Sequence, residues 1–204
     1  MLTLVDAGNR EAHAGLLQSM FVDRKAVFVD YLKWDLEHED GRELDAFDDV
    51  EAQYLILQGP CGRHLGSVRL LSTEGPHLLR DVFPFMCDSA VPTGPHIREI
   101  TRLCVAPDCP SDQRGEITRM LCTALVDHAL LHRIETYTAI TDVAFMARVL
   151  AAGWSCRPLG LPRAVGDARL CALRIDIDQG TPELLRRTGR YRPVPMRLRA
   201  DQRA

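Results

Sequence analysis

Three groups of charged residues are candidates for catalysis or for binding a charged ligand. Asp45 and Asp48 are three residues apart in an acidic segment, a spacing that is also typical of an Asx-rich turn. Arg69 stands inside the apolar stretch GSVRLL, where a buried charge would need a partner. Glu99 and Arg102 share the segment REITRLCV, in which a glutamate either serves general-base catalysis or belongs to a ladder of ion pairs.

A fourth group combines one charge with aromatic rings. Arg24 and Phe28 stand in DRKAVFVDYLKW, and Trp34 ends this segment. The apolar residues around them recur close to helical spacing, so all three are expected on one amphipathic helix and its end. The simplest interpretation is that the rings are core anchors and that Arg24 is a surface ion-pair partner.

The elements that must position these residues begin with a strand and a helix. We expect a strand at residues 2–6, a helix from residue 9 to residue 34 with Asn9 as its N-cap, and a long loop over residues 35–50. The segments AQYLILQ and HLGSVRLLS, joined by GPCGR, predict a β-hairpin.

The rest of the chain predicts helices and strands in alternation. The expected elements are a short helix at residues 77–83 ended by Pro84, a strand at 97–106, a loop at 107–115, a helix at 115–132, a strand at 134–140, a helix at 143–153, strands at 154–160 and 169–177, and a helix at 182–189. Along the strand at 97–106, a two-residue alternation would place Glu99 on one face and Arg102 on the other.

Helices mixed with strands in this order predict an α/β fold, a three-layer α/β/α sandwich with a mixed sheet. The element order resembles the Gcn5-type N-acetyltransferase fold. No repeat and no linker interrupts the pattern, so we expect residues 1–204 to form a single domain.

Composition excludes several classes of function. A net charge of −3 argues against nucleic acid as the main partner. No apolar run approaches the ~20 residues of a membrane-spanning helix, and the start MLTLVDAGNREAH does not resemble a signal peptide. We therefore expect a soluble, cytoplasmic protein with no membrane partner. The scattered cysteines, without a CxxC pair, predict reduced thiols and no metal, with a disulfide scaffold or a zinc site as the alternative.

Taken together, the charged and aromatic residues resemble the invariant set of the acyl-homoserine-lactone synthases, the LuxI-type autoinducer synthases. The resemblance extends over residues 15–155, and its segments are DRKAVFVDYLKW, ELDAFDD, GSVRLL, RDVFP and REITRLCV. The matching residues are Arg24, Phe28, Trp34, Asp45, Asp48, Arg69, Phe83, Glu99 and Arg102. Each motif alone is weak, but the set in this order is specific.

The sequence also differs from the lactone synthases and from ordinary acetyltransferases of this fold. Thr101 and Leu103 stand where many relatives have serine and phenylalanine, which affects the expected substrate more than the reaction. Ordinary acetyltransferases of this fold carry a (Gln/Arg)-x-x-Gly-x-(Gly/Ala) loop for the coenzyme A pyrophosphate, and residues 113–117 lack that spacing. The missing loop favours a lactone synthase and, as acyl donor, a carrier protein.

The resemblance implies an acyltransferase that moves an acyl group from a thioester, on acyl-carrier protein or coenzyme A, to the amine of S-adenosylmethionine (SAM). Lactonisation then releases methylthioadenosine, and the lactone serves quorum sensing. No cofactor is implied, because SAM and the thioester are both substrates. The oligomeric state is not indicated.

Residue roles follow from the same resemblance. The catalytic residues are Glu99 and Arg102, with Glu99 as the base for the SAM amine. The aspartates are suited to the cationic groups of SAM and the arginines to its carboxylate. The implied SAM-binding set is Arg24, Phe28, Trp34, Asp45, Asp48, Arg69 and Phe83. We expect residues 1–50 to be mobile without SAM and to become ordered over it.

The acyl chain and its donor are predicted less sharply. The acyl-pocket candidates, each of which is also explained as simple core, are Met120, Thr138, Thr141, Phe145, Met146 and Trp154. A threonine of the segment IETYTAIT is suited to bind a 3-oxo group, and which one is left open. The basic tail over residues 180–204 would suit an acidic acyl-carrier protein.

Two alternatives remain beside the lactone synthase. One is an N-acyltransferase of the same fold that acylates another amine, which would not need Asp45, Asp48, Arg24 and Trp34 together. The other is a non-catalytic homologue that only binds a ligand, against which the intact Glu99 counts.

Overall fold

The computed structural model describes residues 1–59 and 61–197, and the chain divides into two compact units. The first unit comprises Met1–Arg69, Arg102–Ala124 and the chain from Pro193, and the second comprises Leu70–Thr101 and Leu125–Arg192. Three elements, β5 (His64–Ser72), β6 (Ile97–Val105) and α3 (Ser111–His132), are divided between the units. The single domain over residues 1–204 therefore stays a prediction.

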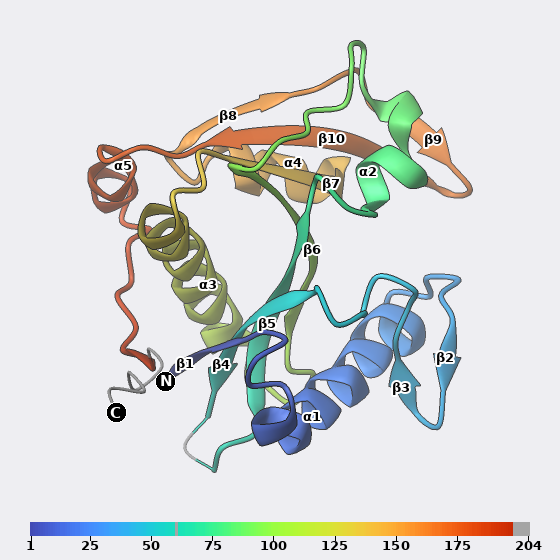
Figure 1. The fold of residues 1–204 in the computed structure, drawn as a ribbon, viewed down its shortest axis with the longest axis vertical. Helices are drawn as coiled ribbons and strands as arrows, with labels where there is room; N and C mark the ends of the chain where they lie inside the picture. The colour runs from blue at the N-terminus through green and yellow to red at the C-terminus, as the bar shows by residue number, and fades with distance from the viewer. Residues whose placement is uncertain (60, 198–204) are drawn as a thin grey trace. The chain divides into compact units, whose positions relative to one another are not determined.

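The first unit combines a helical N-terminal segment with sheet strands in the order β11-β1-β4-β5-β6 (Figure 1). Its remaining elements are β1 (Leu2–Val5), the 3-10 turn η1 (Glu11–His13), α1 (Ala14–Arg24), the π-helix η2 (Lys25–Tyr31), β2 (His38–Glu39), β3 (Arg42–Glu43), β4 (Gln53–Gln58) and β11 (Met196–Arg197). β1 is antiparallel to β4 and parallel to β11. The sheet is therefore mixed, as the sequence predicted.

The predicted hairpin strands are confirmed, because β4 and β5 are neighbours in the sheet. Tyr54 to Leu57 are fully buried along β4, and the buried run in β5 is almost continuous, a pattern typical of strands covered on both faces. The turn is closed by a bond from the Gly59 N–H to the Arg63 carbonyl at 3.0 Å. Pro60, which belongs to this predicted turn, lies outside the described residues.

Three predictions for the N-terminal segment are corrected. The helix is not one α-helix, since it begins as a 3-10 turn at Glu11 and becomes a π-helix at Lys25. Asn9 is not its cap, because the Asn9 side chain instead accepts from the Asp6 N–H and donates to the Leu4 carbonyl, both at 2.9 Å. The long loop predicted at 35–50 contains the small hairpin of β2 and β3, and β3 contacts α1 (Figure 1).

The second unit carries sheet strands in the order β6-β7-β10-β8, and β9 pairs with β10. Its remaining elements are α2 (Leu78–Asp81), the 3-10 turn η3 (Pro84–Met86), β7 (Thr136–Asp142), α4 (Val143–Leu150), β8 (Ser155–Pro158), β9 (Arg163–Val165), β10 (Ala168–Asp176) and α5 (Thr181–Arg187). β6 and β7 are parallel, whereas β7 and β10 are antiparallel. Glu99 lies opposite Thr138 in the parallel pair.

For the second half of the chain, most predicted helices and strands are confirmed, but their ends and the shortest strands differ. The predicted helix at 115–132 begins earlier, at Ser111, because the N–H groups of Gln113 and Arg114 bond to the Pro110 carbonyl and start its first turn. The short strands β9 and β11 were not predicted. Of the basic tail expected at 180–204, residues 198–204 lie outside the described residues. Within the described ranges, no helix has both the length and the apolar character to span a bilayer.

Candidate functional site

Three arginines and three carboxylates of the first unit form a closed ring of ion pairs, which we call the arginine–carboxylate ring. Arg24 binds Glu43 at 2.6 Å and forks onto both oxygens of Asp48 at 2.8 Å. Arg69 binds Asp45 at 2.5 and 3.0 Å and lies 2.9 Å from Asp48. The ring closes through Arg102, which donates to Glu43 at 3.0 Å and to Asp45 at 2.7 Å.

This ring is buried and balanced in charge. The side chains of Arg24, Glu43, Arg69 and Asp48 are at most 1% exposed, while those of Arg102 and Asp45 are 8% and 18% exposed. Buried charges are tolerated when each is paired and hydrogen-bonded. The ring therefore meets solvent, or a ligand, along its Arg102–Asp45 edge.

The ring changes the acidity of its members. Burial alone raises the pKa of the Asp48 carboxyl, but the hydrogen bonds and charges of Arg24 and Arg69 outweigh it and hold that pKa far below its usual range. For the Arg24 guanidinium, burial lowers the pKa, and the bond to Asp48 raises it above its ordinary value. These groups therefore stay ionised across the physiological range.

Further bonds hold the acidic segment in place. The Tyr54 hydroxyl donates to Asp48 at 2.8 Å, and burial together with the Asp48 charge raises the pKa of that hydroxyl. The Arg10 guanidinium donates to the backbone carbonyls of Asp48 and Asp49. Asp45 also accepts from the Phe47 N–H at 2.9 Å. The predicted Asx-rich turn is therefore confirmed, and both aspartates also pair with arginines of the ring.

The aromatic pair lies beside the exposed edge of the ring. Phe28, on η2, is 3% exposed and stacks on Trp34 with ring centroids 5.0 Å apart and an interplanar angle of 9°. The Arg102 guanidinium stands 5.8 Å from the centroid of the Phe28 ring. Trp34 is 42% exposed. Phe28 is thus a core anchor, and Trp34 presents a ring to the surface.

Glu99 belongs to the second unit and is fully buried there. Its two oxygens accept from the N–H groups of Leu78 and Leu79, both at 2.8 Å, so α2 orients the carboxylate. The predicted alternation of β6 is broken further along, because Arg102 has a positive φ of 50°. The simple two-face pattern from Glu99 to Val105 was therefore wrong.

The remaining predicted residues are divided between the units. Met120 lies on α3 in the first unit. Phe83 lies in the second unit and packs against the buried cluster of Leu79, Met86 and Ala172. The other acyl-pocket candidates, all in the second unit, are Thr138 and Thr141 on β7, Phe145 and Met146 on α4, and Trp154 before β8.

Thr138 stands out among these candidates. It is fully buried, and its hydroxyl has no hydrogen-bond partner among the described residues. Buried hydroxyls are normally bonded, because leaving one without a partner costs about 1–3 kcal/mol. The neighbouring Thr136 shows the usual state, since its hydroxyl donates to Asp176 at 3.0 Å. A ligand oxygen would satisfy Thr138.

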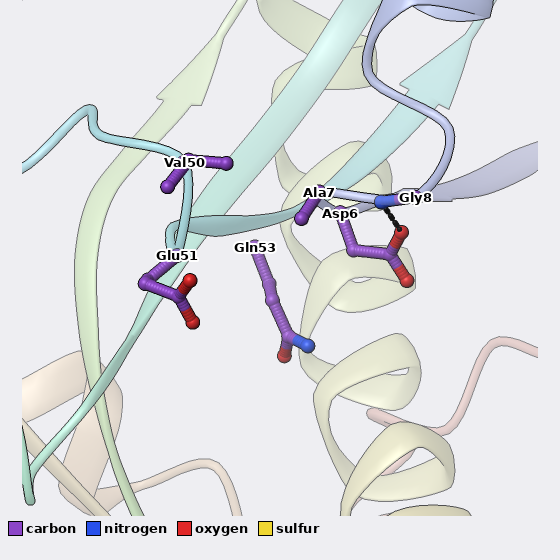
Figure 2. A pocket seen from close by; sticks show the side chains of 6 residues that line it. All are labelled: Asp6, Ala7, Gly8, Val50, Glu51 and Gln53. Carbon is purple, nitrogen blue, oxygen red and sulfur yellow. Dashed lines mark hydrogen bonds between the residues drawn. The ribbon is translucent and has the colours of Figure 1, made fainter.

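A surface hollow of about 340 Å³ lies elsewhere in the first unit (Figure 2). Its lining residues are Asp6, Ala7, Gly8, Val50, Glu51 and Gln53, from the end of β1 and the start of β4. Figure 2 shows the Asp6 carboxylate turned back onto the Gly8 N–H, a bond of 2.8 Å. None of the predicted site residues lines this hollow.

Sequence reasoning missed Glu43 as a site residue. Glu43 appeared only as one acid among many in the segment before Val50, yet it is fully buried and bonds to both Arg24 and Arg102. No local pattern set Glu43 apart from its acidic neighbours, and its role follows from charge balance in the structure, because the three arginines of the ring need three carboxylates.

Known proteins resemble this chain over most of its length. A family model described as autoinducer synthase matches residues 9–185. An isovaleryl-homoserine lactone synthase of Bradyrhizobium diazoefficiens is 32% identical over 188 residues, which cover 91% of this chain and 84% of that protein.

Solved structures of acyl-homoserine lactone synthases are also similar to this chain. The structure of BjaI, a CoA-dependent acyl-homoserine lactone synthase with SAM and isopentyl-CoA, is similar with a TM-score of 0.85 and 32% identity, covering 96% of this chain and 92% of that chain. An acyl-CoA N-acyltransferase from Pseudomonas aeruginosa, 16% identical with a TM-score of 0.57, covers 85% of this chain and 97% of that chain and shares the fold alone.

Proposed function

Because the chain belongs to the autoinducer synthase family and is an acyl-homoserine-lactone synthase, we propose that its SAM lies against the arginine–carboxylate ring and that its acyl donor is an acyl-coenzyme A. The observation that carries the SAM assignment is the Arg102–Asp45 edge, the least buried part of the ring, beside the Phe28–Trp34 stack.

The charges of SAM match this edge. Its ammonium is suited to Asp45, the most exposed carboxylate of the ring, and its carboxylate to the Arg102 guanidinium. Its adenine and sulfonium are suited to the exposed Trp34 ring, because aromatic faces attract cations and stack with bases.

Glu99 is the proposed base of the acylation step. The SAM amine must lose a proton before it attacks the thioester, and a carboxylate held by two backbone N–H groups has a fixed direction for taking it. A C–N bond then forms, the C–S bond of the thioester breaks, and the thiol leaves with a proton. In the second step the SAM carboxylate attacks its γ-carbon and methylthioadenosine leaves.

Thr138 is the residue proposed to form a hydrogen bond with the 3-oxo oxygen of the acyl group. The sequence left open which threonine binds a 3-oxo group, and the buried Thr138 hydroxyl without a partner supports this residue over Thr141. It lies opposite Glu99 in the parallel β6–β7 pair, where side chains of paired residues are neighbours. The acyl chain would run along Phe145, Met146 and Trp154.

The donor assignment differs from the one that the sequence favoured. Residues 113–117, which lack the pyrophosphate-loop spacing, lie inside α3 and form no loop. Similarity to the CoA-dependent BjaI supports coenzyme A in spite of this departure. The carrier protein remains the competing donor, and the test below separates the two.

The test is a reaction of the purified protein with SAM and either isovaleryl-coenzyme A, straight-chain and 3-oxo acyl-coenzyme A, or the matching acyl-carrier proteins. With a coenzyme A donor, we expect acyl-homoserine lactone and methylthioadenosine in equal amounts, both measured by mass spectrometry. Turnover from carrier proteins alone would overturn the donor assignment.

Two variants test the site. Glu99→Gln should slow acylation by about 10²–10⁴-fold while SAM still binds, and the exposed Glu74→Gln should match the wild type. Asp45→Asn should raise the KM for SAM without changing that for the acyl donor. An unchanged acylation rate in Glu99→Gln would show that Glu99 is not the base. An unchanged KM for SAM in Asp45→Asn would show that SAM does not bind at Asp45.

A further inference from the structure

A second buried polar chain lies in the first unit, next to the arginine–carboxylate ring. His64 Nδ1 lies 2.7 Å from an Asp23 carboxylate oxygen, and His64 Nε2 lies 2.9 Å from the Ser67 hydroxyl. All three residues are at most 3% exposed. The ion pairs of the ring do not include them, and no step of the acylation or lactonisation uses them.

This chain joins the two elements that carry ring arginines. Asp23 directly precedes Arg24 at the end of α1. Ser67 precedes Arg69 by two residues on β5, so both side chains share one face of that strand. Arg24 and Arg69 both bind Asp48, so their separation depends on how α1 and β5 are held.

His64 contacts α1 at two successive turns. Its backbone N–H donates to the Ser19 hydroxyl at 3.3 Å, and its ring reaches Asp23. Ser19 and Asp23 are four residues apart and therefore share one helix face. The histidine thus fixes both the distance and the rotation of α1 relative to β5.

The bonding pattern fixes the role of one ring nitrogen. The Asp23 carboxylate only accepts, so Nδ1 donates to it, whereas Nε2 faces the Ser67 hydroxyl, which can donate or accept. An Asp–His–Ser order can activate a serine nucleophile, but Ser67 is 1% exposed and no substrate reaches it. The group is therefore suited to hold structure rather than to perform hydrolysis.

We infer that His64 is a positioning residue of the SAM site, which sets Arg24 and Arg69 through its bonds to Asp23 and Ser67. This inference rests on the proposed assignment of SAM to the ring. The histidine touches no substrate, so its loss should weaken SAM binding without altering use of the acyl donor. A small displacement of either arginine should weaken SAM binding, because the paired hydrogen bonds between a guanidinium and a carboxylate are directional.

The test measures SAM affinity by titration calorimetry on the full chain. His64→Gln, which lacks the ring geometry, should raise the Kd for SAM by about tenfold, and Ser67→Ala by about threefold, because the two changes remove bonds of unequal strength. The KM for the acyl donor should stay within about twofold of wild type. A merely structural role would reduce the fraction of binding-competent protein and leave the Kd of that fraction unchanged.

The matched control is His128→Gln. His128 is also buried, at 1% exposure, and bonds to the Tyr137 hydroxyl at 3.2 Å in the second unit, outside the ring. It should lower the melting temperature yet leave the Kd for SAM unchanged. An equal rise in Kd for His128→Gln, or a wild-type Kd in both His64→Gln and Ser67→Ala, would overturn the inference.

Arg102→Ala separates this outcome from failure of the proposed function. If Arg102→Ala weakens SAM binding and His64→Gln does not, the ring assignment stands and the positioning role falls. If neither changes the Kd, SAM does not lie against the ring and the proposed function itself is wrong at this point.

Discussion

Asp48 shows how the ring ties ionisation to stability. Each of its oxygens lies 2.8 Å from a nitrogen of Arg24, and the same carboxylate accepts from Tyr54 and from the Asp45 N–H. Removing one partner of a buried pair leaves the other charge uncompensated, which typically costs about 3–5 kcal/mol. The ring therefore stabilises the fold only while it is complete.

The lowered pKa of Asp48 predicts acid sensitivity. A carboxyl whose folded pKa lies below its unfolded value of about 3.9 contributes stability above that value and loses it as the pH falls towards the folded pKa. The free energy of unfolding in urea should therefore fall as the pH drops below about 4. Asp48→Asn should be less stable at pH 7 and show a flatter acid dependence.

The exposed Asp30 provides the control for this titration. Its carboxylate pairs with Lys25 at 2.7 Å on the surface, so Asp30→Asn should stay within about 1 kcal/mol of wild type and keep its acid dependence. An equally steep loss of stability at low pH in Asp48→Asn would show that this carboxyl is not the group that titrates.

Thr138 separates stability from function at a single hydroxyl. Because this buried hydroxyl has no partner among the described residues, Thr138→Val should raise the free energy of unfolding by about 1 kcal/mol. Thr136→Val, which removes a bonded hydroxyl of the same strand, should lower it. We expect Thr138→Val also to reduce turnover of 3-oxo donors, measured by lactone yield. A destabilised Thr138→Val would contradict the unsatisfied state.

At the scale of elements, the π-helix η2 places the aromatic side of the site. It follows α1 directly, carries Phe28 in its centre, and ends where the Leu32 N–H bonds to the Val27 carbonyl at 2.9 Å. π-helical turns are rare and often accompany functional sites, because they turn side chains away from the α-helical spacing. Here the turn sets the Phe28 ring beneath Arg102.

The end of α3 allows a test that is independent of the site. Arg133, directly after His132, has a φ of 56°, a left-handed conformation that glycine adopts without strain. Arg133→Gly should therefore raise the free energy of unfolding by about 0.5–1 kcal/mol, measured in urea. Arg133→Ala keeps the strain and should stay near wild type. Equal effects of both changes would show that charge, and not backbone conformation, is responsible.

For the whole molecule, the predicted site residues fall into two sets, one in each unit. The arginine–carboxylate ring and the Phe28–Trp34 stack belong to the first unit. Glu99, Thr138 and most acyl-pocket candidates belong to the second. The proposed roles follow the same division, since SAM recognition is assigned to the first unit and proton transfer and acyl selection to the second.

Ligand binding should be visible in the stability of the whole chain. A ligand that binds only the folded state at 100 times its Kd stabilises it by about 2.7 kcal/mol. For a chain of 204 residues this should raise the melting temperature by about 5–10 °C with SAM. Adenosine, which lacks the amino-acid charges, should give a smaller shift, and Arg102→Ala should reduce the SAM shift. Equal shifts for SAM and adenosine would contradict recognition at the ring.

Local patterns in the sequence predict the elements that have strong periodicity. The buried strands β4 and β5, the strand β6 and the long helix α3 have local periodicity, so they were predicted close to their observed bounds. The family was likewise readable, because the order and spacing of charged and aromatic residues survive in the linear chain.

The pairing of the charges and the position of the weak elements follow from the tertiary structure. Glu43 joins Arg24 and Arg102, which lie 19 and 59 residues away, and His64 reaches back 41 residues to Asp23. Local periodicity holds no information about such distant partners. The two-residue strands β2, β3 and β11 form because a neighbouring strand supplies their hydrogen bonds. The positive φ of Arg102 occurs at a residue whose side chain bonds to the distant carboxylates of Glu43 and Asp45.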